Sequence, residues 1–166
     1  MKAIASPPPP RASVRAPELQ HEPAQAKAPI VAAVDGSAAS RSVIDSALGL
    51  AAELEMPLVF VYVRRGPASS LGAPLYQRRL TKAMAHASGI LDGALAAAAR
   101  AGVDAEGEIL EGRPRKRILE FARDRGARLI VVGSRRRKLG PSVSGAICVS
   151  ADGPVVVLSP SVLLSS

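Results

Sequence analysis

The chain alternates between short apolar runs and longer segments in which apolar residues recur at helical spacing. Four runs, at 30–34 (IVAAV), 58–63 (LVFVYV), 128–132 (RLIVV) and 154–158 (PVVVL), are almost entirely apolar, that at 58–63 continuously so, and a fifth at 103–110 alternates apolar and polar residues. Continuous apolar runs are typical of strands covered on both faces, whereas alternation indicates a half-exposed edge strand. Strands that alternate with helices form a parallel sheet with helices on both faces. We therefore predict an α/β domain.

Cap and turn residues bound four predicted helices. The first ends before Pro57, the second runs over about 76–101 with Gly102 as its cap, the third begins at Pro114, and the fourth covers about 142–150. Apolar residues three or four positions apart mark the face of each helix that we expect to be buried. These residues are Val43, Ile44, Ala47, Leu48, Ala51 and Leu54, then Leu80, Met84, Ala87, Leu91, Ala94 and Ala98, then Ile118, Phe121 and Ala122, and finally Val143, Ala146 and Ile147.

Charge and composition narrow the classes of ligand. The net charge of +8, from 22 basic and 14 acidic residues, attracts anionic partners. Aromatic residues make up only 2% of the chain, which leaves little to stack on bases, so we do not expect nucleic-acid binding. Cys148 is the single cysteine, and His21 and His86 have no metal-like spacing, so neither a disulfide within the chain nor a metal site is expected.

The ends of the chain differ from its middle. Residues 1–28 contain four consecutive prolines and few large apolar side chains. Such a segment cannot bury enough apolar surface to offset the conformational entropy lost on ordering. We expect a disordered leader, either passive or a ligand for a proline-reading domain, then a domain over 29–159 and a short tail at 160–166. No apolar run approaches the ~20 residues of a membrane span and none resembles a signal-peptide core, so a cytoplasmic protein without membrane contact is expected.

Two stretches carry a resemblance to a known family. They are PIVAAVDGSAASRSVIDSAL at 29–48, and EGRPRKRILEFARDRGARLIVVGSRRR at 111–137 continued by SVSGAICVSADGPVVVLS at 142–159. In order and spacing they resemble the universal stress protein family. The resemblance implies an adenine nucleotide alpha hydrolase-like fold, an open five-stranded parallel sheet of order 3-2-1-4-5 with helices on both faces. It also implies a homodimer that pairs through the last strand, Val155–Leu158.

The implied strand order reverses between the first and fourth strands. Open parallel sheets bind ligands at such a reversal, outside the carboxyl ends of the strands, and the family keeps ATP there. Asp35-Gly36-Ser37 should then lie beside Gly133-Ser134, and Val63 should line the same cleft. We expect Asp35 to meet the ribose or adenine of a ligand, to cap the first helix, or both. Ser37 is expected to cap rather than to act as a nucleophile, because no histidine lies near it.

The segment after the fourth strand departs from the ATP-binding members of the family. Those members place glycines at three positions there, and the backbone amides wrap the phosphates. This chain keeps Gly133 but has Arg136 at the second position. Gly140 is followed by Pro141, which stands where the third glycine is expected before Ser142 and which has no N–H to donate.

Three functions stay open at this point. We expect a non-enzymatic stress-response domain with a degenerate nucleotide cleft, acting as a dimer. The alternative is an ATP-binding regulatory sensor in which the basic run 135–138 holds phosphates by charge. An ATP hydrolase or adenylyl transferase is less favoured, since no acid–base pair, activated nucleophile or cluster of metal-binding carboxylates is visible. ATP is thus a candidate ligand, contacted by Asp35, Gly36, Ser37, Val63, Gly133, Ser134, Arg136, Gly140, Ser142 and Val143.

Overall fold

A computed structural model describes residues 27–66, 72–134 and 143–158. Most of the predicted leader, the predicted tail and the basic run at 135–138 lie outside these residues. The elements alternate as predicted, and each strand bound lies within two residues of the expected one. They are β1 Ile30–Ala33, α1 Ala38–Leu54, β2 Leu58–Arg64, α2 Ala73–Ala101, β3 Ala105–Glu111, α3 Pro114–Asp124, β4 Leu129–Gly133, α4 Val143–Ser150 and β5 Val155–Leu158.

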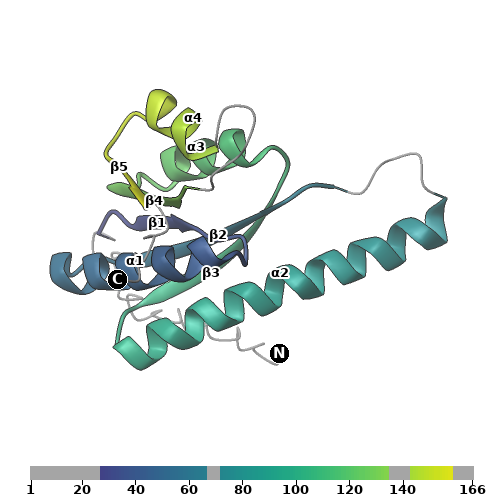
Figure 1. Cartoon of the computed structure of the whole chain (residues 1–166), viewed down its shortest axis with the longest axis horizontal. Helices are drawn as coiled ribbons and strands as arrows, with labels where there is room; N and C mark the ends of the chain where they lie inside the picture. The colour runs from purple at the N-terminus through teal and green to yellow at the C-terminus, as the bar shows by residue number, and fades with distance from the viewer. Residues whose placement is uncertain (1–26, 67–71, 135–142, 159–166) are drawn as a thin grey trace, which may run out of the picture.

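The five strands form one parallel sheet in the order β3-β2-β1-β4-β5, which confirms the implied topology. At the centre, Ile30 of β1 pairs with Leu58 of β2 on one side and with Leu129 of β4 on the other. Helices α1 and α2 cover one face of the sheet, and α3 and α4 cover the other (Figure 1). The chain therefore turns to opposite faces after β1 and after β4, and this reversal separates the two turns enough to leave a crevice between them.

Side chains of the central strands alternate between two cores. Ile30, Ala32 and Phe60 pack with α1 and α2, whereas Val31 and Val61 pack with α3 and α4. All five are fully buried. This burial on both faces explains why the central strands appear in the sequence as continuous apolar runs.

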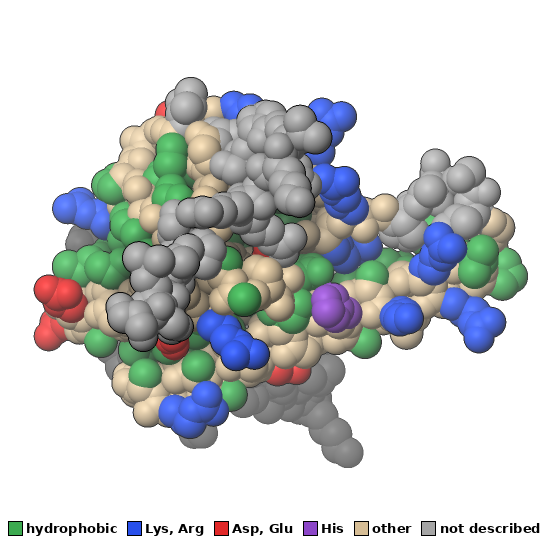
Figure 2. All heavy atoms as spheres, in the orientation of Figure 1, with side chains coloured by type: hydrophobic (Ala, Val, Ile, Leu, Met, Phe, Trp, Pro, Cys, Tyr) green, Lys and Arg blue, Asp and Glu red, His purple; other side chains and the backbone are tan. Residues whose placement is uncertain are grey.

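Helix α2 is longer than predicted and projects beyond the sheet. It begins at Ala73 rather than near 76, because Pro74 fits the first turn of a helix instead of breaking it. Only its second half is buried, so the prediction that Leu80 and Met84 belong to the core is wrong, and Met84 is 36% exposed. Figures 1 and 2 show this projecting first half, with basic side chains spaced along it. Helical spacing predicts which residues share a face, but it does not show where the sheet beneath them ends.

Two other predicted core residues lie at element ends and are exposed. Leu54, the last residue of α1, is 49% exposed, and Val143, the first residue of α4, is 39% exposed. Ser144 and Ile147 are buried in α4 instead, while the side chain of Ala146 lies outside the described residues. In the part of the chain that the structure describes, no helix has both the length and the hydropathy needed to cross a bilayer.

Candidate functional site

The turn after β1 is held by a short network between Asp35 and Ser40. The carboxylate Oδ1 of Asp35 accepts hydrogen bonds from the Ser37 backbone N–H (2.9 Å) and the Ser40 hydroxyl (2.8 Å). The Asp35 N–H in turn donates to the Ser40 Oγ (2.8 Å). Asp35 therefore closes the turn that leads into α1, and the network fixes where its carboxylate lies, while its role as a helix cap stays a prediction.

The prediction that the Ser37 side chain caps α1 is wrong. Ser37 occupies the N-cap position of α1, but its side chain makes no capping hydrogen bond. Its Oγ is buried without a hydrogen-bond partner among the described residues. The hydroxyl of Ser40 bonds to Asp35 instead. This substitution is possible because one helical turn from the N-cap brings Ser40 back over the start of the helix.

Gly36 has a packing reason for being glycine. Its φ of +77° lies in the left-handed region, and a Cβ there would come within 2.7 Å of Ile90 Cδ1 on α2. The positive φ therefore favours glycine here, and the end of the Ile90 side chain would have to shift to admit a Cβ. Gly36 is not among the residues that line the cleft described next, so its predicted contact with a ligand is not supported by the lining.

A cleft of about 260 Å³ opens at the carboxyl ends of β1, β2 and β4, between the first turns of α1, α3 and α4. Asp35 and Gly133 both line it, so the first and fourth turns meet as the strand order requires. Val63, Ser37 and Val143 also line it. Of the other predicted site residues, Ser134 does not line the cleft, whereas Arg136, Gly140 and Ser142 lie outside the described residues. Contact between the lining residues and a ligand stays a prediction.

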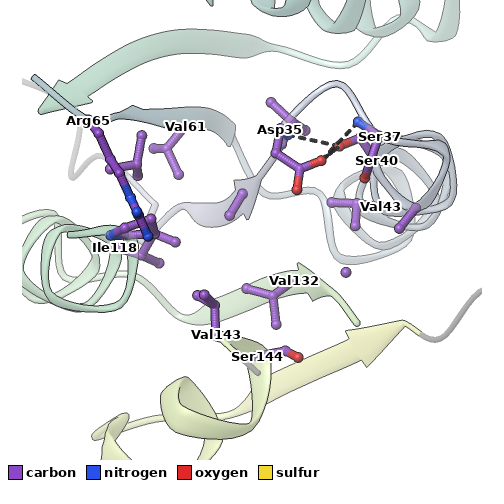
Figure 3. Close-up of a pocket in the computed structure, with 16 residues that line it drawn as sticks. Asp35, Ser37, Ser40, Val43, Val61, Arg65, Ile118, Val132, Val143 and Ser144 are labelled. Carbon is purple, nitrogen blue, oxygen red and sulfur yellow. Dashed lines mark hydrogen bonds between the residues drawn. The ribbon is translucent and has the colours of Figure 1, made fainter. Parts of the chain in front are cut away.

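The sequence analysis missed Arg65, Ser40 and Ser144, which also line the cleft. Arg65 follows the last residue of β2, and Figure 3 shows its side chain reaching toward Ile118 of α3, on the opposite side of the cleft from Asp35. A signal for Arg65 was available, since any residue just past a strand's carboxyl end near the reversal is a candidate.

Gly133 also has a structural explanation. A Cβ on this residue would lie 3.2 Å from both Ala39 Cβ and Val43 Cγ2, on the face of α1 that crosses the end of β4. Glycine here allows α1 to approach the sheet. Because packing alone explains a glycine at position 133, Gly133 is weaker evidence for a phosphate-binding loop than the family resemblance suggested.

The described lining of the cleft is mostly apolar, with few charged side chains. Among the described lining residues, Asp35 and Arg65 carry the only ionisable side chains. Between them lie apolar side chains that include Val61 and Val132 (Figure 3). His86 is remote in the fold, since it lies on α2 and makes an edge contact with Tyr62, which packs on the α1–α2 face of the sheet. The described lining therefore offers apolar side chains with one acidic residue, Asp35, and one basic residue, Arg65.

An open parallel sheet with a cleft where its strand order reverses defines a class of α/β folds, and the comparisons specify the family. The model of the universal stress protein family matches residues 28–159, and the chain belongs to that family. It is 31% identical over 143 residues to universal stress protein YxiE of Bacillus subtilis, covering 78% of this chain and 97% of the relative.

Solved structures agree. A universal stress protein from Burkholderia pseudomallei superimposes with a TM-score of 0.68 at 28% identity, covering 82% of this chain and 98% of that one. The fold is the adenine nucleotide alpha hydrolase-like fold that the family resemblance implied. A universal stress protein from Archaeoglobus fulgidus, solved in complex with dAMP, has a TM-score of 0.65 at 23% identity and covers 80% of this chain and 98% of that one. Others of this fold were solved with cAMP or AMP.

Proposed function

We propose that this universal stress protein is a non-enzymatic regulatory protein whose cleft binds an adenine nucleotide. The observation that carries the proposal is the arrangement of the cleft, with Asp35 and Arg65 at opposite sides of an apolar floor (Figure 3). The faces of a base pack well on apolar side chains. A carboxylate accepts hydrogen bonds from a ribose hydroxyl or an exocyclic amine, and a guanidinium binds phosphate in a bidentate way.

The size of the cleft favours a ligand that only partly enters it. Its volume of about 260 Å³ lies just below the usual range of about 300–1,000 Å³ for small-molecule pockets. A nucleoside fits this volume better than a whole nucleoside triphosphate, so phosphates would extend past Arg65. The solved relatives that hold dAMP, cAMP or AMP support the choice of adenine nucleotide, since they show that this fold accommodates one.

The second candidate is the nucleotide-free protein that the sequence favoured. Arg136 and Pro141 replace two glycines of the family's phosphate loop, and the packing of Gly133 against α1 accounts for the third. In that case the cleft is a remnant and the protein acts through its surface alone.

Calorimetric titration with AMP, ATP and GTP separates the two candidates. We expect saturable binding of AMP and ATP, weaker binding of GTP, and a loss of affinity of about tenfold in Asp35→Asn, which removes the charge but keeps an oxygen that accepts from Ser37 and Ser40. The matched control is Asp92→Asn, an exposed carboxylate on α2. Absence of heat with every nucleotide at millimolar concentration would establish the nucleotide-free alternative.

The non-enzymatic part of the proposal rests on the described lining of the cleft. Asp35 is engaged with a backbone amide and a hydroxyl, and the described lining holds no His, Cys or Lys to activate a nucleophile. Incubation with ATP should release neither phosphate nor pyrophosphate above a protein-free blank. Release that disappears in Asp35→Asn would show that the protein is an enzyme.

We further propose that two copies pair through β5. This strand is the last in the sheet order, paired to β4 on one side, and Val157 in its centre is 38% exposed. An apolar edge strand presents unpaired backbone groups and is a natural site for pairing with a second chain.

A further inference from the structure

A second groove opens beside the cleft, and three arginines line it. Its volume is about 510 Å³, and its lining includes Arg65, Arg113 and Arg115 together with Gly112 at the β3–α3 turn. We call it the arginine groove. It shares Arg65, Pro114 and Val143 with the cleft, so the two are continuous and Arg65 stands between them.

The positive charge of the arginine groove is not neutralised by the described side chains around it. No acidic residue is among its described lining residues. The carboxylate of Glu111 lies against Gly66 but is paired with Arg64. Glu120 on α3 is paired with Arg117 at 2.8 Å and lies 3.7 Å from Lys116.

The three arginines differ in what holds them. Arg115 donates to the Ser150 hydroxyl, an uncharged acceptor that leaves its charge unbalanced. Arg65 and Arg113 are both exposed, and neither has a carboxylate partner among the residues described. Like charges gathered in one groove repel one another, and a bound anion removes that repulsion.

The backbone at this place adds to the same field. Arg113 is the N-cap of α3, makes no side-chain cap, and is followed by a first turn without acidic residues. Gly112, with φ of +133°, turns the chain from β3 into α3, and its N–H donates to the Arg64 carbonyl at 2.9 Å. The start of α3 is therefore tied to the end of β2, which keeps Arg65 and Arg113 close.

We propose that the arginine groove is the phosphate subsite of the cleft. Arg65 and Arg113 bind the phosphates of a nucleoside di- or triphosphate whose base and sugar lie between Asp35 and Val132. This inference rests on the proposed function and extends it, because it directs the phosphates toward α3. A guanidinium binds phosphate bidentately without needing close backbone approach, so the arrangement tolerates a proline in the β4–α4 segment.

The test compares adenosine, AMP and ATP by calorimetry at low salt in Arg65→Gln, Arg113→Gln and the double variant. We expect each single substitution to weaken ATP about tenfold or more, and to leave adenosine within about twofold. The matched control is Arg128→Gln, an exposed arginine just before β4, at the opposite end of the strands. All three positions are exposed, so each variant should keep the circular dichroism and melting temperature of the parent.

The outcomes separate this inference from the proposed function. If the parent protein binds ATP and the double variant binds it equally well, the arginine groove is overturned while nucleotide binding stands. If the parent binds neither ATP nor adenosine, the proposed function fails, and tripolyphosphate alone then tests the groove. If the parent binds tripolyphosphate and the double variant does not, the arginine groove is an anion site. If the parent does not bind tripolyphosphate, the arginine groove is refuted as an anion site.

Discussion

Replacing Gly133 by alanine tests whether this residue serves packing or phosphate binding. The added Cβ would lie 3.2 Å from Ala39 Cβ and from Val43 Cγ2, and 3.6 Å from the Ala39 carbonyl oxygen. Ordinary carbon contacts are about 3.5–4.0 Å. Ala39 cannot yield without moving the α1 backbone, and Val43 is fully buried in the core beneath α1.

We therefore expect Gly133→Ala to lower the free energy of unfolding by about 1–2 kcal/mol, the usual cost of overpacking a tight contact. For a domain of this size, that corresponds to a fall in Tm of about 3–8 °C. Urea denaturation followed by far-ultraviolet circular dichroism measures the change, because the chain has no Trp to report by fluorescence.

Two variants make the result interpretable. Gly49→Ala lies in α1 with nothing within 4 Å of its new Cβ and should stabilise the helix by about 0.5–1 kcal/mol. Combining Gly133→Ala with Val43→Ala removes one of the two 3.2 Å contacts, so the alanine at 133 should cost less in that background. A Gly133→Ala protein as stable as the parent, with ATP binding abolished, would refute the packing argument and restore a phosphate role.

Three further outcomes follow from the structure. Light-scattering chromatography should show a dimer with twice the 17.1 kDa mass of the chain, and Val157→Lys should convert it into a monomer. Leu75→Lys, at the far end of α2, should leave the dimer intact. A Val157→Lys protein that is still a dimer would exclude β5 as the interface. Gly36→Ala should lower stability by about 1–3 kcal/mol in urea, since it meets Ile90 at positive φ, and an unchanged midpoint would contradict that contact. Ser40→Ala should cost about 1–2 kcal/mol and weaken AMP binding, because Asp35 loses its hydroxyl partner; unaltered AMP affinity would show that the network does not position the carboxylate.

Much of the fold was predictable because both faces of its central strands are covered. β1 and β2 are apolar along most of their length, and Pro57, Gly102 and Pro114 stand at helix ends where such residues are favoured. The projecting half of α2 was not predictable in the same way. Leu80 and Met84 continue the spacing of the buried stripe, and only the extent of the sheet decides that Leu80 is half-buried and Met84 is exposed.

The candidate site was predictable in position more than in detail. The strand order implied by the family resemblance placed Asp35 beside Gly133, and the structure brings both to one cleft. Ser40 and Arg65 were missed because their roles depend on tertiary geometry. The hydroxyl of Ser40 bonds to Asp35 through the path of the first turn of α1, and Arg65 faces the cleft because α3 packs beside the end of β2.

The most direct test of the account is a titration of ¹⁵N-labelled protein with AMP, followed by amide chemical shifts. The account predicts saturable shifts for the amides of Asp35, Arg65 and Ser144 around the cleft, with those of Glu106 and Glu108 on the edge strand β3 unchanged. Shifts confined to β3, or none at millimolar AMP, would contradict nucleotide binding at the reversal between β1 and β4.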